Sequence, residues 1–143
     1  MGLEVIPGNH YLAYVLDEAT QKHLLSLFPP KNSVVKCHHV TIAREIKPEH
    51  ARYFQMLVDM NPVFETTTWM QGPGIELFTV TMNGLVRRFD YKIHHITHSH
   101  STDREANDSN HLLEGRIDCI GRKYGVTHRL NGQFQLIPYS RES

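Results

Sequence analysis

The chain has 143 residues, of which 40% are hydrophobic and 21% are charged, a composition typical of a globular domain and not of a disordered chain. Its 15 Lys and Arg residues equal its 15 Asp and Glu residues, so it lacks the basic excess that usually accompanies binding along a long nucleic acid duplex. Two cysteines are too few for a disulfide framework, and no apolar run has the length of a membrane span. We expect a soluble, cytoplasmic protein with one domain over residues 1–143, without a membrane partner.

The first half of the chain predicts two strands that alternate with two helices. Residues 10–17 alternate and are rich in Tyr and aliphatic side chains, which is typical of a strand. Residues 17–28 begin with acidic residues and continue with leucines, which predicts a short helix that ends before Pro29–Pro30. The β-branched stretch over 33–46 predicts a second strand, and apolar residues at helical spacing over 47–60 predict a second helix.

The second half predicts more strand than helix. Strands are expected over 63–71 and 74–82, joined by a Gly-Pro-Gly turn, and over 91–100. The polar run over 101–110 predicts a loop, which is either a lid over a site or a plain connector. A helix is expected over 110–125, and a hairpin about an Asn-Gly pair closes the chain. Because no linker interrupts this order, we predict a single α+β domain whose halves roughly repeat.

Two stretches, "CHHVTIA" at 37–43 and "IHHITHS" at 93–99, are nearly the same. Each places two histidines, an aliphatic residue and a threonine in a row, and these are the chain's only His-His pairs. Successive side chains of a strand point to opposite faces, so the second histidine of each pair shares a face with the threonine two residues later. The pattern therefore predicts two matched pairs, His39 with Thr41 and His95 with Thr97.

Such pairs suit chemistry on a phosphodiester. An imidazole has an ordinary pKa of about 6.5, so it can act as base or acid at cellular pH. A threonine hydroxyl beside it can donate a hydrogen bond to a phosphoryl oxygen. Two pairs facing each other across a cleft would hold a phosphate from both sides, with one histidine activating the attacking oxygen and the other protonating the leaving oxygen. The sequence leaves open which histidine has which role.

HVTI at 39–42 and HITH at 95–98 resemble the two His-hydrophobic-Thr-hydrophobic motifs of the 2H phosphoesterase superfamily. "SNHLL" at 109–113 is similar to a Ser-Asn-x-Leu-Leu segment that follows the second motif in that family. The resemblance covers most of the chain, although it is loose outside the motifs. One position departs from the pattern, because His98 stands where an apolar residue is usual.

This resemblance implies a bilobal α+β fold, with two lobes related by a pseudo-twofold axis and antiparallel sheets around a central cleft. It implies an enzyme that needs no metal or other cofactor and acts on a nucleotide or RNA-terminal phosphodiester, above all a 2′,3′-cyclic phosphate. Some phage relatives instead cleave cyclic oligonucleotides. Carried over by motif, His39 and His95 become the acid/base pair, and Thr41 and Thr97 become the phosphate ligands.

A nucleotide site also needs a surface on which the base can stack, because stacking on an aromatic ring contributes on the order of 1–3 kcal/mol per base. Tyr11 and Tyr139 are the candidates, because each lies near the end of an expected strand. The same cleft could also bind a nucleotide or RNA end without turnover, and a non-catalytic binding module is therefore the alternative from a different functional class.

Three other features have both a functional and a structural interpretation. His98 and His100 have the spacing of two metal ligands on one strand face, although a polar strand end explains them more simply. Cys37 could be a nucleophile beside His39, but a free cysteine is more often a small buried side chain. Arg87–Arg88 could meet a phosphate, but an exposed charged pair on a hairpin is the commoner case.

Overall fold

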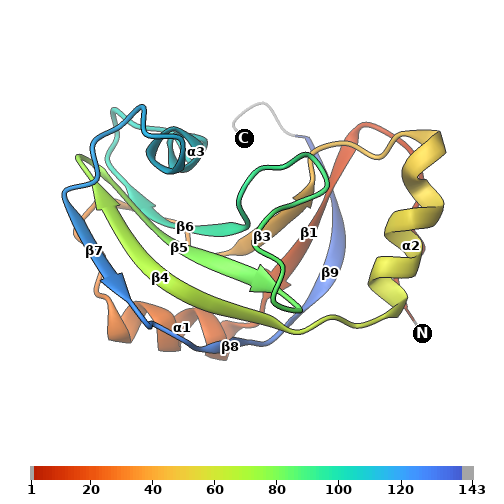
Figure 1. Cartoon of the computed structure of the whole chain (residues 1–143), viewed down its shortest axis with the longest axis horizontal. Coiled ribbons are helices and arrows are strands. Elements are labelled where there is room, and N and C mark those ends of the chain that lie inside the picture. The colour runs from red at the N-terminus through yellow and green to blue at the C-terminus, as the bar shows by residue number, and fades with distance from the viewer. Residues whose placement is uncertain (1, 140–143) are drawn as a thin grey trace.

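The computed structural model describes residues 2–139 and has an α+β architecture, as the sequence predicts (Figure 1). Most of the expected elements are present, and a 3-10 turn, η1 (Pro48–His50), leads into α2. The helices are α1 (Glu18–Leu27), α2 (Ala51–Asp59) and α3 (Asp108–Leu113). The strands are β1 (His10–Leu16), β2 (Val34–Val35), β3 (His39–Ala43), β4 (Phe64–Gly72), β5 (Ile75–Met82), β6 (His95–His100), β7 (Gly121–Tyr124), β8 (Arg129–Leu130) and β9 (Gly132–Pro138).

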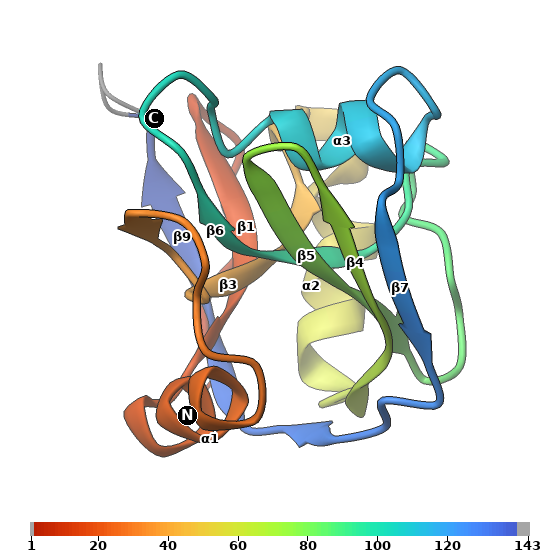
Figure 2. The same cartoon turned by 90° about the vertical axis from the view of Figure 1, so that its left-hand side faces the viewer.

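The strands form two antiparallel sheets. One has three strands in the order β3-β1-β9, and the other has the order β2-β6-β5-β4-β7, with β8 also paired to β4. Strands β2 and β3 are neighbours in the sequence but lie in different sheets. The same is true of β8 and β9, which pair with β4 and β1, so the hairpin expected about Asn131-Gly132 is wrong. The chain thus crosses from sheet to sheet four times, between β1 and β2, β2 and β3, β3 and β4, and β8 and β9. The motif strands β3 and β6 lie close together in both views (Figures 1 and 2).

The expected helix over 110–125 is wrong. The helix α3 begins earlier, at Asp108, and ends at Leu113, because Gly115 has a φ of +80° that takes the backbone out of the helical region. Residues 121–124 instead form β7, which pairs with the edge of β4. Pairing with a free sheet edge is a long-range contact that local helix propensity does not report.

The middle residues of the two motifs anchor their strands in the core. Val40 and Ile96 are completely buried, and both belong to an apolar cluster to which the two sheets and the helices α1 and α2 contribute. Burial of a side chain of this size stabilises the fold by about 1.5–3 kcal/mol. Because strand neighbours alternate, this anchoring turns the histidine and threonine on either side of each buried residue toward the opposite face.

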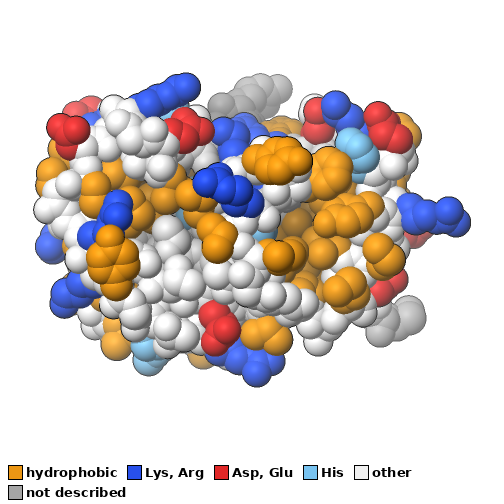
Figure 3. Space-filling model, in the orientation of Figure 1, with side chains coloured by type: hydrophobic (Ala, Val, Ile, Leu, Met, Phe, Trp, Pro, Cys, Tyr) orange, Lys and Arg blue, Asp and Glu red, His pale blue; other side chains and the backbone are white. Residues whose placement is uncertain are grey.

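The helix α2 presents apolar side chains to the surface as well as to the core. Its Phe54 contacts Phe89 of the loop after β5, with 5.5 Å between ring centroids, and Tyr53 lies 5.4 Å from the same ring. Exposed apolar side chains gather over this part of the molecule (Figure 3). None of the helices in residues 2–139 combines the length and the apolar content that crossing a bilayer requires.

Candidate active site

The first motif strand carries a β-bulge directly after its threonine. In the pairing with β1, Leu12 lies opposite Ala43 and Ala13 lies opposite Thr41. The neighbouring strand therefore advances by one residue where β3 advances by two, and Ile42 is the extra residue. Half-buried and buried positions alternate from His39 to Ile42 in β3, and Ala43 is buried as well.

The second motif strand repeats this pattern. Leu77 of β5 lies opposite Thr97, and Glu76 lies opposite Ser99, so His98 is the extra residue of a bulge in β6. The burial pattern of β6 also matches that of β3 over five residues. The two stretches that look alike in the sequence thus also have the same local backbone pattern.

The bulge in β6 corrects the expected assignment of faces beyond Thr97. Strict alternation would place His100 on the face opposite His95, but the extra residue at His98 brings His100 into the same cleft as His95 and Thr97. His98 itself is completely buried, and its Nε2 donates to the carbonyl oxygen of Phe28 at 2.6 Å. His98 and His100 are therefore not the ligand pair that their spacing suggests.

The segment between β2 and β3 joins the two motif strands. The backbone N–H of Cys37 donates to the carbonyl oxygen of Thr97 at 2.8 Å, and that of Lys36 donates to His98 at 2.9 Å. Cys37 has a φ of +49°, so the chain turns there and Cys37 does not continue the alternation of His39 and Thr41. Its side chain is completely buried, and burial raises the pKa of the thiol to about 12. A buried, protonated thiol is a poor nucleophile, which removes Cys37 from the candidate catalytic residues.

A cleft of about 850 Å³ is lined by both motif strands and by the segment that leads into α3. In Figure 1, α3 and the end of β9 both lie above these strands, on either side of them. The six residues that the sequence assigns to the site all line this one cleft: Tyr11, His39, Thr41, His95, Thr97 and Tyr139. Residues as far apart in the chain as Tyr11 and Tyr139 are thus brought together around one space large enough for a small-molecule ligand.

His95 has a fixed tautomer. Its Nδ1 lies 2.9 Å from the carbonyl oxygen of Ile93, and because a carbonyl only accepts, Nδ1 carries the proton and Nε2 keeps a free lone pair. Burial, with further contributions from nearby cationic and imidazole groups such as Arg88, lowers the pKa of His95 to about 4. His95 is therefore neutral at neutral pH and has the form of a general base.

His39 has a different partner. Its Nδ1 lies 3.0 Å from Nδ1 of His38, whose ring is exposed, and its ring centroid is 5.6 Å from that of Tyr11. Burial, together with the nearby His38, His95 and Lys36, lowers the pKa of His39 to about 4. The electrostatic effect of His95 on His39 agrees with their position in one cleft.

The two threonines also differ in their surroundings. The hydroxyl of Thr97 lies 2.8 Å from Oγ of Ser109 and donates to the carbonyl oxygen of Ala106 at 3.2 Å. The hydroxyl of Thr41 makes no hydrogen bond to any residue within 2–139. Thr41 is thus ready to donate to a ligand, whereas Thr97 also fixes the segment before α3.

Sequence reasoning did not place Arg88 in the site. The expectation of an exposed charged pair is wrong for this residue, because only 6% of Arg88 is exposed and it lines the cleft beside His95. Its Nε and Nη2 donate to the two carboxylate oxygens of Asp90, at 2.9 and 2.5 Å. This bidentate pair holds the guanidinium in one orientation. Besides the Arg-Arg pair, the Arg-x-Asp spacing at 88–90 is the sequence signal that could have indicated it.

The segment over 104–110 supplies a further wall of the cleft. Arg104, Glu105, Asn107 and Asn110 all line it, and Asn110 is largely buried. Ser109 anchors the segment to Thr97, so the Ser-Asn part of "SNHLL" has a structural role next to the motif. The long polar loop is therefore part of the site and not a connector remote from it.

A buried polar network lies behind β6. Glu76 is completely buried, and its Oε1 accepts hydrogen bonds from the backbone of Lys31 at 2.9 Å, from Nδ2 of Asn32 at 3.2 Å and from Oγ of Ser99 at 2.9 Å. These hydrogen bonds to Glu76, together with the bond from His98 to Phe28, connect the segment between α1 and β2 to the second motif strand. Within residues 2–139 no group of three or more His, Cys, Asp or Glu side chains is arranged to hold a metal ion.

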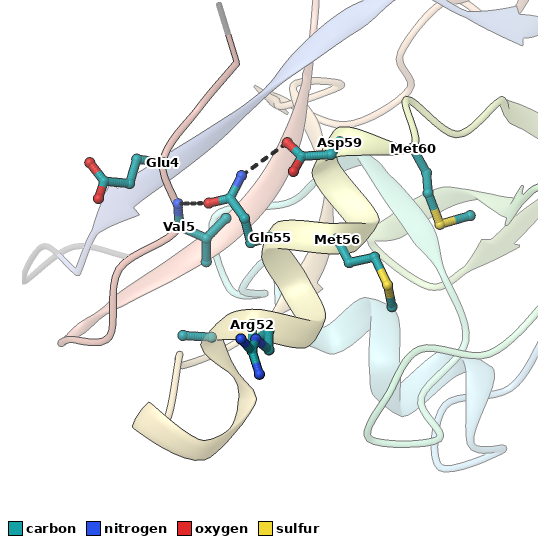
Figure 4. Close-up of a pocket in the computed structure, with 8 residues that line it drawn as sticks. Glu4, Val5, Arg52, Gln55, Met56, Asp59 and Met60 are labelled. Atoms are coloured by element: carbon teal, nitrogen blue, oxygen red, sulfur yellow. Dashed lines mark hydrogen bonds between the residues drawn. The ribbon is translucent and has the colours of Figure 1, made fainter.

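A second cavity, of about 520 Å³, lies between the N-terminal segment and α2 and is lined by none of the predicted site residues (Figure 4). Gln55 joins its two walls, because its side chain accepts from the backbone N–H of Val5 at 2.6 Å and donates to the carbonyl oxygen of Leu3 at 2.9 Å. It also donates to Asp59 of its own helix at 3.0 Å. No histidine lines this cavity, so it offers no pair of imidazoles of the kind found in the cleft.

Comparison of the chain with protein-family models, with curated proteins and with solved structures gives no match.

Proposed function

We propose that this protein is a phosphodiesterase of the 2H type, in which His39 and His95 act as the general acid/base pair. The observation that carries the proposal is that two His/Thr pairs, on strands with the same burial and bulge patterns, line one cleft. The same likeness of β3 and β6 supports the inference that the two sheets belong to lobes related by a pseudo-twofold axis. The favoured substrate is a 2′,3′-cyclic phosphate or an RNA end, and a cyclic oligonucleotide is the close alternative.

In the proposed reaction His95 is the base. Its Nε2 has a free lone pair, since its proton is on Nδ1 and is donated to Ile93. Nε2 takes a proton from a water molecule as the water oxygen bonds to phosphorus. The bond from phosphorus to one ribose oxygen breaks, and protonated His39 gives its proton to that oxygen. Thr41 donates a hydrogen bond to a non-bridging oxygen, and Thr97 does so when its hydroxyl turns away from Ala106.

Proton exchange with solvent favours His39 as the acid. His39 contacts the exposed ring of His38, which connects it to solvent, whereas Nδ1 of His95 is bonded to a backbone carbonyl. The negative charge of a bound phosphate favours the protonated form of an imidazole beside it, which opposes the lowering of the pKa of His39 in the empty cleft. Arg88, held by Asp90, would stabilise negative charge that develops on the phosphoryl oxygens.

A panel of substrates in EDTA tests the proposal. It contains 2′,3′-cyclic mononucleotides, an oligonucleotide ending in a cyclic phosphate, and cyclic di- and trinucleotides. We expect one class to be cleaved and the variants His39→Ala and His95→Ala to lose about 10²–10⁴-fold in rate. The exposed His23 on α1 gives the control variant His23→Ala, which should keep full activity.

His95→Asn sharpens this experiment. The Asn side-chain amide can keep the hydrogen bond to Ile93 that Nδ1 of His95 makes, but it has no group in place of Nε2. This variant should fold as the wild type does, as judged by circular dichroism, and still be inactive. Full activity in His95→Asn, or activity that requires a metal ion, would contradict the proposed roles.

A non-catalytic nucleotide-binding module is the second candidate. The observation that favours it is that the pKa values of His39 and His95 are both about 4 in the empty cleft, so neither is a ready proton donor at neutral pH. A binding module would show affinity for a nucleotide, by calorimetry, without cleavage of any member of the panel.

A further inference from the structure

The cleft contains more positive charge than one phosphate requires. Four cationic side chains line it, and Glu105 is the one carboxylate among its lining residues: the cations are Lys36, Arg44, Arg88 and Arg104. The chain as a whole has no net charge, so this excess is local to the cleft. A cleft lined by one sign of charge raises the local concentration of ligands with the opposite sign.

These cations differ in what they can do for a ligand. Arg88 is fixed beside His95 by its ion pair with Asp90, and Lys36 is near enough to His39 to lower its pKa. Both therefore lie with the two histidines, where the phosphate that reacts would be bound. Arg44 lies beyond Thr41, three residues further along the chain and directly after the end of β3.

Arg44 has no carboxylate partner. No Asp or Glu within residues 2–139 forms an ion pair with it, and its side chain is exposed along the cleft. Arg104 also lacks such a partner in the described chain, but its Nε donates to the carbonyl oxygen of Pro73 at 3.0 Å, which ties it to the turn between β4 and β5. Arg44 is therefore the cation that is both separate from the histidines and available to a ligand.

A row of aromatic rings leads from the catalytic centre to Arg44. The ring of His39 is 5.6 Å from that of Tyr11, and the ring of Tyr11 is 5.4 Å from that of Tyr139. The hydroxyl of Tyr139 donates to the carbonyl oxygen of Arg44. A nucleoside attached to a phosphate at His39 would meet the tyrosine pair next. The backbone of Arg44 lies beside that pair, and its exposed side chain also lines the cleft.

We propose that this cleft has a second phosphate-binding subsite at Arg44, separated from the reacting phosphate by one nucleoside that contacts Tyr11 and Tyr139. The inference rests on the proposed phosphodiesterase function and narrows its substrate class. The preferred substrate carries a second phosphate or phosphodiester, as a linear RNA end or a cyclic oligonucleotide does, whereas a 2′,3′-cyclic mononucleotide occupies only the reacting half of the cleft.

Two substrates that differ only in one group test the subsite: adenosine 2′,3′-cyclic phosphate with and without a 5′-phosphate. A charge-assisted hydrogen bond to the additional phosphate should raise kcat/KM about 10- to 100-fold in the wild type. In Arg44→Ala this ratio should fall close to one, and Arg44→Lys should retain part of it. Arg52 on α2, which lines the other cavity, gives the control Arg52→Ala, and that variant should keep the wild-type ratio.

A binding measurement keeps this test independent of turnover. Adenosine 3′,5′-bisphosphate should bind more tightly than adenosine 3′-monophosphate by calorimetry, and Arg44→Ala should remove the difference. A wild-type ratio near one in both measurements, with the mononucleotide still cleaved, would overturn the subsite and leave the phosphodiesterase proposal intact. Absence of any cleavage together with an Arg44-dependent preference for the bisphosphate would overturn the phosphodiesterase proposal and leave a nucleotide-binding cleft.

The same panel distinguishes the two sources of a second phosphate. A linear dinucleotide ending in a 2′,3′-cyclic phosphate and a 3′,5′-cyclic dinucleotide both carry it, but only the linear molecule has free ends. Preferential cleavage of one of them, lost in Arg44→Ala and not in Arg52→Ala, assigns the substrate to that class.

Discussion

The two motif strands, β3 and β6, have the same buried positions and the same bulge, yet their side chains have different partners. The extra residue of the first bulge, Ile42, lies in the apolar core, whereas its counterpart His98 is bonded to Phe28 beside the network of Glu76. The local backbone therefore does not depend on whether apolar packing or hydrogen bonds fill the space behind it. The departure from the motif at His98 follows from this difference, because the second strand also holds the segment between α1 and β2.

The histidines differ in a related way. His95 is bonded to a backbone carbonyl that cannot change its role, whereas His39 is bonded to the exposed ring of His38. A fixed tautomer suits a base that acts in the same way in each cycle, and a partner in contact with solvent suits a group that must regain a proton. The two halves of the site are thus alike in geometry and unlike in proton supply.

Arg88 is the clearest difference between the surroundings of the two histidines, because it is a buried arginine beside His95 and His39 has no such neighbour within residues 2–139. Its substitution therefore tests this difference most directly. We expect Arg88→Ala to lower kcat about 10²–10³-fold through loss of charge stabilisation in the transition state. The neighbouring exposed Arg87, which bonds the carbonyl oxygen of Tyr91, provides the control Arg87→Ala. Steady-state kinetics on the cleaved substrate measure both, and equal losses in the two variants would remove Arg88 from the site.

The pH dependence tests whether the two histidines work as one acid and one base. The pKa values of His39 and His95 in the free protein are both about 4. Well above pH 4, the fraction of protein molecules in which one of the two histidines is protonated therefore falls about tenfold per pH unit. We expect kcat/KM to rise as pH is lowered from 8 to 5, and kcat, which reports the substrate complex, to peak at higher pH. A kcat/KM that is constant over this range would contradict the pairing.

The same pKa shifts predict how stability changes with pH. Each histidine has a lower pKa in the folded chain than the ordinary value of about 6.5, so the unfolded chain binds more protons between pH 6.5 and 4. The free energy of unfolding should therefore fall as pH falls through this range. In His39→Ala with His95→Ala the fall should be smaller, and urea unfolding at pH 7 and pH 5 measures the difference.

The smallest effects are expected for Glu76 and Ile42, which lie behind the bulges of β6 and β3 and act on the stability of the fold. Glu76→Ala removes the acceptor of three buried or partly buried donors and should lower the free energy of unfolding by about 3 kcal/mol, whereas Glu76→Gln keeps an acceptor oxygen and should cost less. Ile42→Val behind the first strand removes one buried methylene and should cost about 0.5–1.5 kcal/mol. Urea unfolding compares the variants, and a smaller loss in Glu76→Ala than in Ile42→Val would show that the network contributes little.

The sequence by itself selected the candidate site residues that line the cleft. His39, Thr41, His95 and Thr97 follow from two copies of one phrase, because strand alternation is a local rule that holds across the three residues of each His-x-Thr. The α+β class and the positions of most strands and helices follow in the same way from local periodicity. Tyr11 and Tyr139 could be selected because they stand near strand ends, and both line the cleft.

Only the tertiary structure decided the rest, because it depends on contacts between residues far apart in the chain. The burial of Arg88 depends on how the loop after β5 folds against the rest of the protein. The position of His100 in the cleft depends on the bulge in β6, which its pairing with β5 sets. The turn at Cys37 and the strand at β7 depend on hydrogen bonds to Thr97 and to β4. Local propensity contains no information on such partners, and these contacts determine which charges surround the two histidines.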